Sequence, residues 1–135
     1  METKRRYVAD TVGLARFFED SLPAKADRAF KEAEDGNAVI LIPEIVTAEF
    51  VYIALRGRLK SNDPNALIQE LLGELDAAAG FRQVGMTRNA WTEFLLSEIP
   101  ELHDRMIHAI AKTEEVDAII TNDREIASSG FRTIW

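Results

Sequence analysis

Four acidic residues stand where a divalent metal centre could form: Asp10, Glu49, Asp104 and Asp123. Asp10 directly follows one apolar segment, and Asp123 lies just beyond another. Carboxylate oxygens are the ligands that Mg²⁺ and Mn²⁺ prefer. One or two such ions can clamp a phosphodiester and lower the pKa of a water molecule. If the fold brings the four acids together, they predict metal-assisted phosphodiester chemistry.

Each acid also has a simpler interpretation that the sequence leaves open. Asp10 could serve as the N-cap of a helix, and Asp123 could be a turn residue beside Asn122. Asp104 could stabilise the N-terminus of a helix through the helix dipole.

Glu49 is the only charged residue from Val46 to Leu55. On a helix it shares a face with Ile45 and Ile53, which predicts a position facing the core. A buried carboxylate there needs a metal ion or a buried arginine as compensation. The alternative is a helix rotated so that Glu49 lies at the rim.

Predicted strands alternate with predicted helices along the chain. The strands are expected at 6–9, 38–42, 81–86, 116–120 and 131–135. The helices are expected at 11–18, 23–34, 44–58, 64–79, 102–114 and 124–128, with a further helix after Thr87 that carries Trp91. Thr11, Asp63 and Thr87 are the expected N-caps of the helices that begin beside them, and Gly80 is expected to end the helix at 64–79. This alternation predicts one α/β domain over residues 1–135, with a parallel sheet of four to five strands covered on both faces. Ligands of such sheets bind at the carboxyl ends of the strands.

Composition narrows the function classes. The chain has 135 residues, a net charge of −7, two histidines and no cysteine. Disulfides, thiolate metal sites and structural zinc are therefore excluded. No signal peptide or membrane span is visible, so a cytoplasmic protein is expected. The acidic balance lacks the overall basic character typical of nucleic-acid binders, so any RNA affinity must come from a local groove.

Four segments together resemble the PIN-domain family, in order and spacing, over essentially the whole chain. They are Tyr7-Val8-Ala9-Asp10-Thr11, Ile42-Pro43-Glu44-Ile45-Val46-Thr47-Ala48-Glu49, Asp104-Arg105-Met106-Ile107-His108-Ala109-Ile110-Ala111 and Ala118-Ile119-Ile120-Thr121-Asn122-Asp123. The resemblance implies a three-layer α/β/α fold. It also implies that Asp10, Glu49, Asp104 and Asp123 are metal-binding acids, and that Thr11 and Thr121 support the site.

Three residues depart from the family pattern: Arg105, His108 and Ile126. We interpret Arg105 either as a contact to the substrate phosphate or as one half of a surface ion pair. His103 and His108 are interpreted as surface or helix-packing residues, although His108 could supply a nitrogen ligand.

The resemblance implies a Mg²⁺- or Mn²⁺-dependent ribonuclease that cuts single-stranded RNA by in-line attack of water. The chain is similar in size to VapC toxins, which implies a type II toxin with a cognate antitoxin. The family resemblance also implies a homodimer. The alternatives are a housekeeping RNA-processing nuclease and a non-catalytic module that binds RNA or protein. A haloacid-dehalogenase phosphatase is disfavoured because Val12 stands where its second aspartate is needed. No glycine-rich phosphate loop supports a Rossmann or P-loop enzyme.

Overall fold

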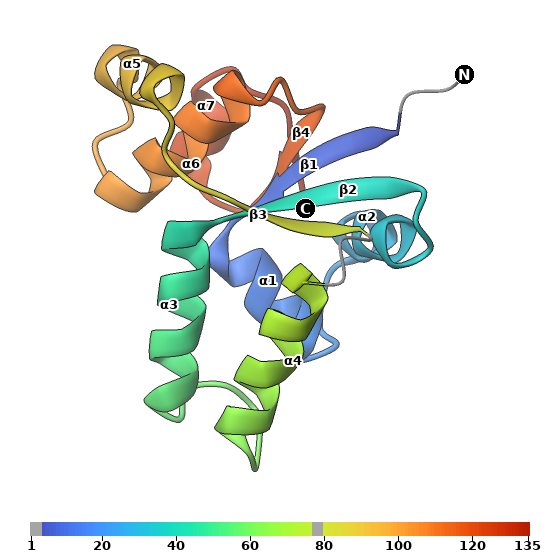
Figure 1. Cartoon of the computed structure of the whole chain (residues 1–135). Coiled ribbons are helices and arrows are strands. Elements are labelled where there is room, and N and C mark those ends of the chain that lie inside the picture. Colours follow the sequence, from blue (N-terminus) through green and yellow to red (C-terminus); the bar gives the residue numbers. More distant parts are fainter. Residues whose placement is uncertain (1–3, 77–79) are drawn as a thin grey trace.

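A parallel β-sheet organises the protein (Figure 1). The computed structural model describes residues 4–76 and 80–135. Within these residues the strand order is β3-β2-β1-β4-β5, and every neighbouring pair is parallel. The strands are β1 (Arg5–Ala9), β2 (Ala38–Pro43), β3 (Phe81–Val84), β4 (Ala118–Ile120) and β5 (Thr133–Ile134).

Helices cover both faces of the sheet, which gives three layers. In Figure 1, α1 to α4 lie on one side of the strands and α5 to α7 on the other. The helices are α1 (Thr11–Phe18), α2 (Ala24–Glu34), α3 (Glu44–Leu55), α4 (Pro64–Asp76), α5 (Arg88–Leu96), α6 (Leu102–Thr113) and α7 (Arg124–Ser128). The predicted α/β/α class with a five-stranded parallel sheet is therefore confirmed.

The chain changes direction across the sheet between β1 and β4. From β1 it builds outward through β2 to β3, and it then returns to place β4 on the other side of β1. Crossovers on opposite faces leave a crevice at the carboxyl ends of the two strands where the order reverses. Any ligand site of this fold is expected there.

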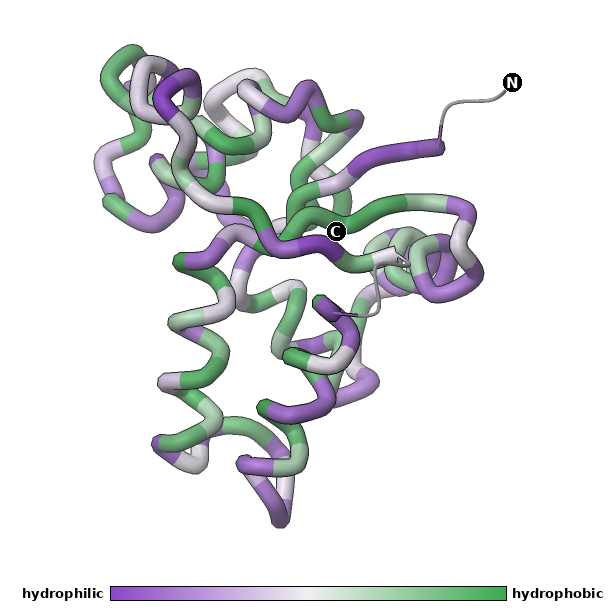
Figure 2. Tube along the Cα trace, viewed as in Figure 1, coloured by the Kyte–Doolittle hydropathy of each residue, from purple (hydrophilic) through white to green (hydrophobic). Residues whose placement is uncertain are grey.

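The core lies on both faces of the central strands. All six residues of β2 are buried, and the same segment is predominantly green in Figure 2, as expected for a strand covered on both sides. Aromatic rings extend the core beneath the sheet. Phe17 stacks on Phe30 with ring centroids 4.6 Å apart, and Phe81 packs against both rings.

Several predicted boundaries shift for identifiable local reasons. Helix α1 is capped by Asp10, whose side chain accepts from the Gly13 amide, so the prediction that Thr11 is the cap is wrong. Helix α3 ends at Leu55, three residues early, and Gly57 follows with φ of +69°. The caps predicted at Asp63 and Thr87 are confirmed by bonds to Ala66 and Ala90.

The weaker strands are shorter than predicted. β3 ends at Val84, β4 begins at Ala118, and β5 is two residues long. The predicted end of the fourth helix at residue 79 lies outside the described residues. Nowhere in the two described stretches is a helix both long enough and apolar enough to cross a membrane.

Gly80 fixes how closely β3 approaches α2. A Cβ atom added at Gly80 would lie 1.9 Å from the carbonyl oxygen of Ala33, a backbone atom that cannot rotate away. We expect Gly80→Ala to lower the free energy of unfolding by about 3 kcal/mol, because the sheet or the helix must shift. Urea denaturation measures this.

Gly73→Ala is the matched control. Gly73 lies within α4, and an added Cβ would meet no atom within 4 Å. This substitution should leave stability unchanged or raise it by about 0.5–1 kcal/mol, because alanine favours a helix over glycine. Equal effects of the two substitutions would contradict the close approach.

Candidate functional site

The four predicted acids line one cleft at the carboxyl edge of β1 and β4. Its volume is about 230 Å³, and the residues lining it are Asp10, Thr11, Val12, Glu49, Glu101, His103, Asp104, Ile107, Asn122 and Asp123. Neither lysine nor arginine is among these lining residues. The structure thus brings together residues from α1, α3, α6 and the turn after β4, at the point where the strand order reverses.

Asp10 is the most buried of the four acids, with 6% of its surface exposed. Its Oδ1 accepts from the Gly13 amide at 2.7 Å, and its Oδ2 accepts from the Thr121 hydroxyl. Burial raises the pKa of Asp10, the two hydrogen bonds oppose that change, and repulsion from Asp123 and Glu49 adds to it. Asp10 therefore both caps α1 and lies in the cleft, so its two interpretations are compatible.

Thr121 joins the two acids that follow β1 and β4. Its hydroxyl is buried, donates to Asp10 and accepts from the Asp123 amide at 3.0 Å. Asp123 in turn caps α7, with its Oδ1 accepting from the Ile126 amide at 3.0 Å. One hydroxyl thus binds the Asp10 carboxylate, 111 residues away, and the backbone amide of Asp123.

Glu49 lies at the rim of the cleft, with 32% of its side chain exposed. The buried stripe of α3 consists of Val46, Phe50 and Ala54, so the predicted core-facing position of Glu49 is wrong and the rim alternative is right. No arginine compensates its charge. Instead the Thr11 hydroxyl donates to Oε1 at 2.9 Å, and the Nδ1 atom of His103 lies 3.1 Å from Oε2.

Asp104 lies in the first turn of α6. Glu101 caps this helix, and its Oε2 accepts from the Asp104 amide at 2.7 Å. Burial, followed by repulsion from Asp123 and Glu101, raises the pKa of Asp104 to about 7. Asp104 therefore lies near the N-terminus of a helix, as expected if it stabilises the helix dipole. Its side chain also lies among the like charges of Asp123 and Glu101.

His103 is the site residue that sequence reasoning missed. It lines the cleft between Glu49 and Glu101, with Nδ1 3.1 Å and 3.8 Å from their respective oxygens. Its position directly before Asp104 was the available signal. His108 is buried elsewhere in the helix packing, with Nδ1 on Ser97, and does not line the acidic cleft.

Arg105 lies outside the cleft. Its Nε donates to the Phe94 carbonyl at 2.8 Å, its Nη2 donates to the Leu95 carbonyl at 3.4 Å, and the guanidinium lies over the Phe94 ring. These bonds tie α6 to the end of α5. Its contact with a substrate phosphate stays a prediction that this geometry does not favour.

The donor set fits a hard divalent cation in its chemistry. The cleft offers carboxylate oxygens from four residues, and burial together with repulsion between the acids raises the pKa of Asp10 and Asp104, an effect that a bound cation would oppose. Among the described residues, however, no three acidic or histidine side chains are arranged closely enough to hold an ion. Oxygens of Asp10, Glu49 and Asp123 are instead bonded to neighbouring donors.

Comparison with known proteins points to one family. The PIN domain family matches residues 7–131. No curated protein sequence matches the chain.

Among solved structures, the chain is similar to three from toxin–antitoxin systems. VapBC2 from Rickettsia felis, bound to a DNA fragment from its promoter, is 17% identical with a TM-score of 0.72, covering 96% of this chain and 98% of that one. VapC20 from Mycobacterium tuberculosis, a toxin that cleaves the sarcin–ricin loop, is 14% identical with a TM-score of 0.65, covering 93% and 95%. A toxin–antitoxin complex from Klebsiella pneumoniae is 17% identical with a TM-score of 0.65, covering 96% of each chain. At these identities the likeness shows a common fold.

Removing the charge of Asp104 should stabilise the metal-free protein at high pH. The folded pKa of about 7 exceeds the ordinary 3.8, so ionising Asp104 costs stability, fully above pH 7 and not at all below about pH 4. Because solvent screens this half-buried side chain, we expect Asp104→Asn to gain about 1 kcal/mol at pH 8, or about 3–5 °C in Tm. Thermal unfolding in EDTA at pH 8 and pH 4 measures the difference.

Asp63→Asn is the control for this pH dependence. Asp63 is an exposed N-cap far from the cleft, and asparagine caps a helix equally well. Its Tm should match that of wild type at both pH values. A gain for Asp104→Asn that is the same at pH 4 and pH 8 would refute charge repulsion as its cause.

Loss of the Thr121 hydroxyl should weaken the framework of the site. Thr121→Val keeps the shape of the side chain but leaves the buried Asp10 oxygen and the Asp123 amide without their partner. We expect a loss of about 1–3 kcal/mol in urea denaturation. Thr121→Ser keeps the hydroxyl and should lose less; equal losses would show that only packing matters.

Proposed function

Because the chain belongs to the PIN domain family, we propose that it is a Mg²⁺- or Mn²⁺-dependent endoribonuclease that acts on single-stranded RNA. We also infer that residues 1–135 work as one PIN domain. The observation that carries the proposal is the acidic cleft at the switch point of the sheet, lined by Asp10, Glu49, Asp104 and Asp123.

Within this proposal, the four acids hold the cation and the phosphodiester lies across the cleft. A bound divalent cation supplies Lewis-acid chemistry: it polarises the phosphoryl group and lowers the pKa of the attacking water. Attack in line with the leaving oxygen requires no covalent intermediate on a side chain. The residues of this chain therefore act mainly by position and charge.

Hydrogen bonds from neighbouring side chains keep the acids in place. The Thr121 hydroxyl orients the Asp10 carboxylate and binds the backbone amide of Asp123, and the Thr11 hydroxyl orients Glu49. His103 lies against Glu49 on its other oxygen and restricts its rotamer. Substituting the hydrogen-bond partner of a metal ligand commonly lowers metal affinity or activity by about 10–100-fold. In this scheme His103 is such a partner of Glu49, and we class it as a positioning residue.

The fold likeness to toxin chains supports a toxin role with a cognate antitoxin, in the cytoplasm where RNA is available. Exposed apolar residues supply candidate contact surfaces. On α5 they are Trp91, Leu95 and Leu96, which are 47%, 77% and 70% exposed. We propose that such surfaces bind the antitoxin or a second copy of the chain as a homodimer.

The test is cleavage of a fluorescent single-stranded RNA panel with Mn²⁺, Mg²⁺ or EDTA. Asp10→Asn keeps one oxygen to cap α1, but it removes the charge and replaces the acceptor of the Thr121 hydroxyl by an amide nitrogen. It should cut at least about 100-fold more slowly, and circular dichroism checks that it folds. Asp63→Asn, with the same chemical change on an exposed cap, should cut like wild type.

Folded, antitoxin-free protein that neither cuts any RNA nor binds Mn²⁺ would overturn the nuclease proposal in favour of a non-catalytic interaction module. The toxin role has its own test. Expression should arrest growth, and co-expression of a small neighbouring reading frame should relieve the arrest. Metal-dependent cleavage without growth arrest would indicate a housekeeping RNA-processing nuclease.

A further inference from the structure

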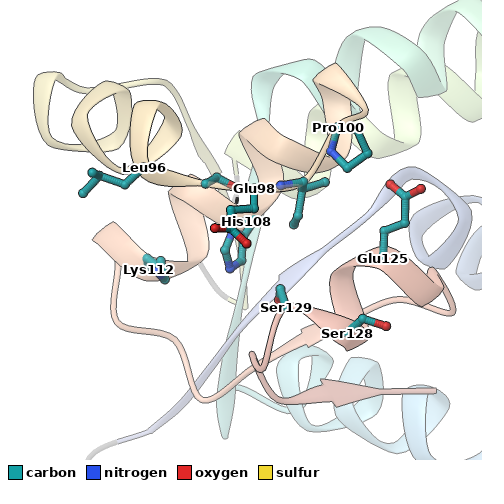
Figure 3. Close-up of a pocket in the computed structure, with 10 residues that line it drawn as sticks. Leu96, Glu98, Pro100, His108, Lys112, Glu125, Ser128 and Ser129 are labelled. Carbon is teal, nitrogen blue, oxygen red and sulfur yellow. Dashed lines mark hydrogen bonds between the residues drawn. The ribbon is translucent and has the colours of Figure 1, made fainter.

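A second pocket of about 500 Å³ lies beside the acidic cleft (Figure 3). Its lining includes Ser97, Glu98, His108, Lys112, Glu125 and Ser129, none of which lines the cleft. This volume is typical of small-molecule and nucleotide sites. The described function of the four acids leaves this pocket unused.

Residues that are neighbours along the chain line the two cavities. Pro100 lines the pocket and Glu101, the next residue, lines the cleft, so their Cα atoms are about 3.8 Å apart. Helix α7 has its cap Asp123 in the cleft and Glu125 in the pocket. An RNA chain whose phosphodiester lies in the cleft can therefore place a neighbouring nucleotide in the pocket.

His108 provides the pocket with a buried polar atom that has no partner. The residue is 4% exposed, and its Nε2 forms no hydrogen bond with any residue that the structure describes. Its Nδ1 lies 3.1 Å from the Ser97 hydroxyl, whose oxygen already accepts from the Ile99 amide. The Ser97 hydroxyl can donate its proton to Nδ1 while its oxygen accepts from Ile99, and in that tautomer the imidazole proton lies on Nε2 as an unused donor.

Burial lowers the pKa of His108, so the imidazole is neutral near pH 7. In Figure 3 the ring extends from α6 toward the segment that carries Ser129. The unused donor therefore belongs to a neutral group, which suits an uncharged acceptor better than an anion.

Two carboxylates add acceptors on opposite sides of the pocket. Glu98 comes from the segment before α6, and Glu125 comes from α7, with its carboxylate directed toward the side of Pro100 in Figure 3. The positive charge of Lys112 is shared with Glu93, 3.8 Å away. This balance disfavours a phosphate and favours a neutral ligand with N–H groups and at least one acceptor.

We propose that the pocket binds a nucleobase with an exocyclic amino group, from a nucleotide next to the phosphodiester held in the acidic cleft. This inference rests on the proposed ribonuclease function. Adenine, cytosine and guanine each offer an amino donor to a carboxylate and a ring or carbonyl acceptor to the imidazole. Uracil has no amino group, and its single N3–H donor lies between two carbonyl oxygens, so an approach to a carboxylate also brings an acceptor against it.

The test is cleavage of single-stranded RNAs that differ at one position near the cut. At one such position we expect uracil to lower the rate about tenfold relative to the three other bases. Glu98→Gln and Glu125→Gln should remove this discrimination, because an amide offers a donor as well as an acceptor. Glu70→Gln, an exposed site on α4, should preserve it.

A second measurement separates this inference from the proposed function. Cytidine or uridine is titrated into metal-free protein, and the ring signals of the two histidines are followed by NMR, with His103→Gln to assign them. Cytidine, but not uridine, should shift the His108 signals, and Glu98→Gln should reduce that shift. This result supports the pocket even if no RNA is cut.

The inference would be overturned if RNA is cleaved but no base preference changes on Glu98→Gln or Glu125→Gln. The nuclease proposal would then remain intact. An unchanged His108 signal with both nucleosides would also overturn it. Equal shifts with cytidine and uridine would overturn the proposed selection for an amino group.

Discussion

Repulsion among like charges is the constraint on which this structure depends. Four carboxylates lie at one edge of the sheet with no lysine or arginine among the residues that line their cleft. A basic partner would neutralise them and remove their capacity for a cation. The fold instead uses amide and hydroxyl donors: Asp10 and Asp123 cap helices, and threonines bond Asp10 and Glu49. The remaining electrostatic cost appears at Asp104, where burial and repulsion from Asp123 and Glu101 raise the pKa to about 7.

Helix capping and site formation are the same interactions in this protein. An aspartate cap must lie where a helix begins, and in a parallel α/β sheet helices begin at the carboxyl edge of the strands. Two of the acids therefore reach the cleft through ordinary local stabilisation. Capping and metal binding are compatible roles for Asp10, because a carboxylate has two oxygens and several lone pairs. One oxygen can cap while the remaining lone pairs face the cleft.

Sequence patterns could predict the layers, the strands and the four acids, because these depend on local periodicity and on the residues that follow each strand. The rotation of α3 could not be predicted, since its apolar residues occur on more than one face and tertiary packing selected Val46, Phe50 and Ala54 for the core. The contact of His103 with Glu49 joins residues 54 apart, and only the assembled sheet brings them together. The position of Arg105 could not be predicted either. Its guanidinium donates to backbone carbonyls of α5, and a pattern of charged residues does not reveal such neutral acceptors.

The bond between Thr121 and Asp10 has a consequence for biosynthesis. These residues are 111 positions apart, and β1 cannot pair with β4 until the segment at 118–120 has been made. Such long-range contacts form late in folding, after the local helices. A nascent chain, or a fragment that stops before Thr121, therefore carries Asp10, Glu49 and Asp104 but lacks the Thr121 hydroxyl that bonds Asp10. If the protein is harmful to the cell that makes it, this topology delays the harm until β4 and the turn that carries Thr121 and Asp123 have been made.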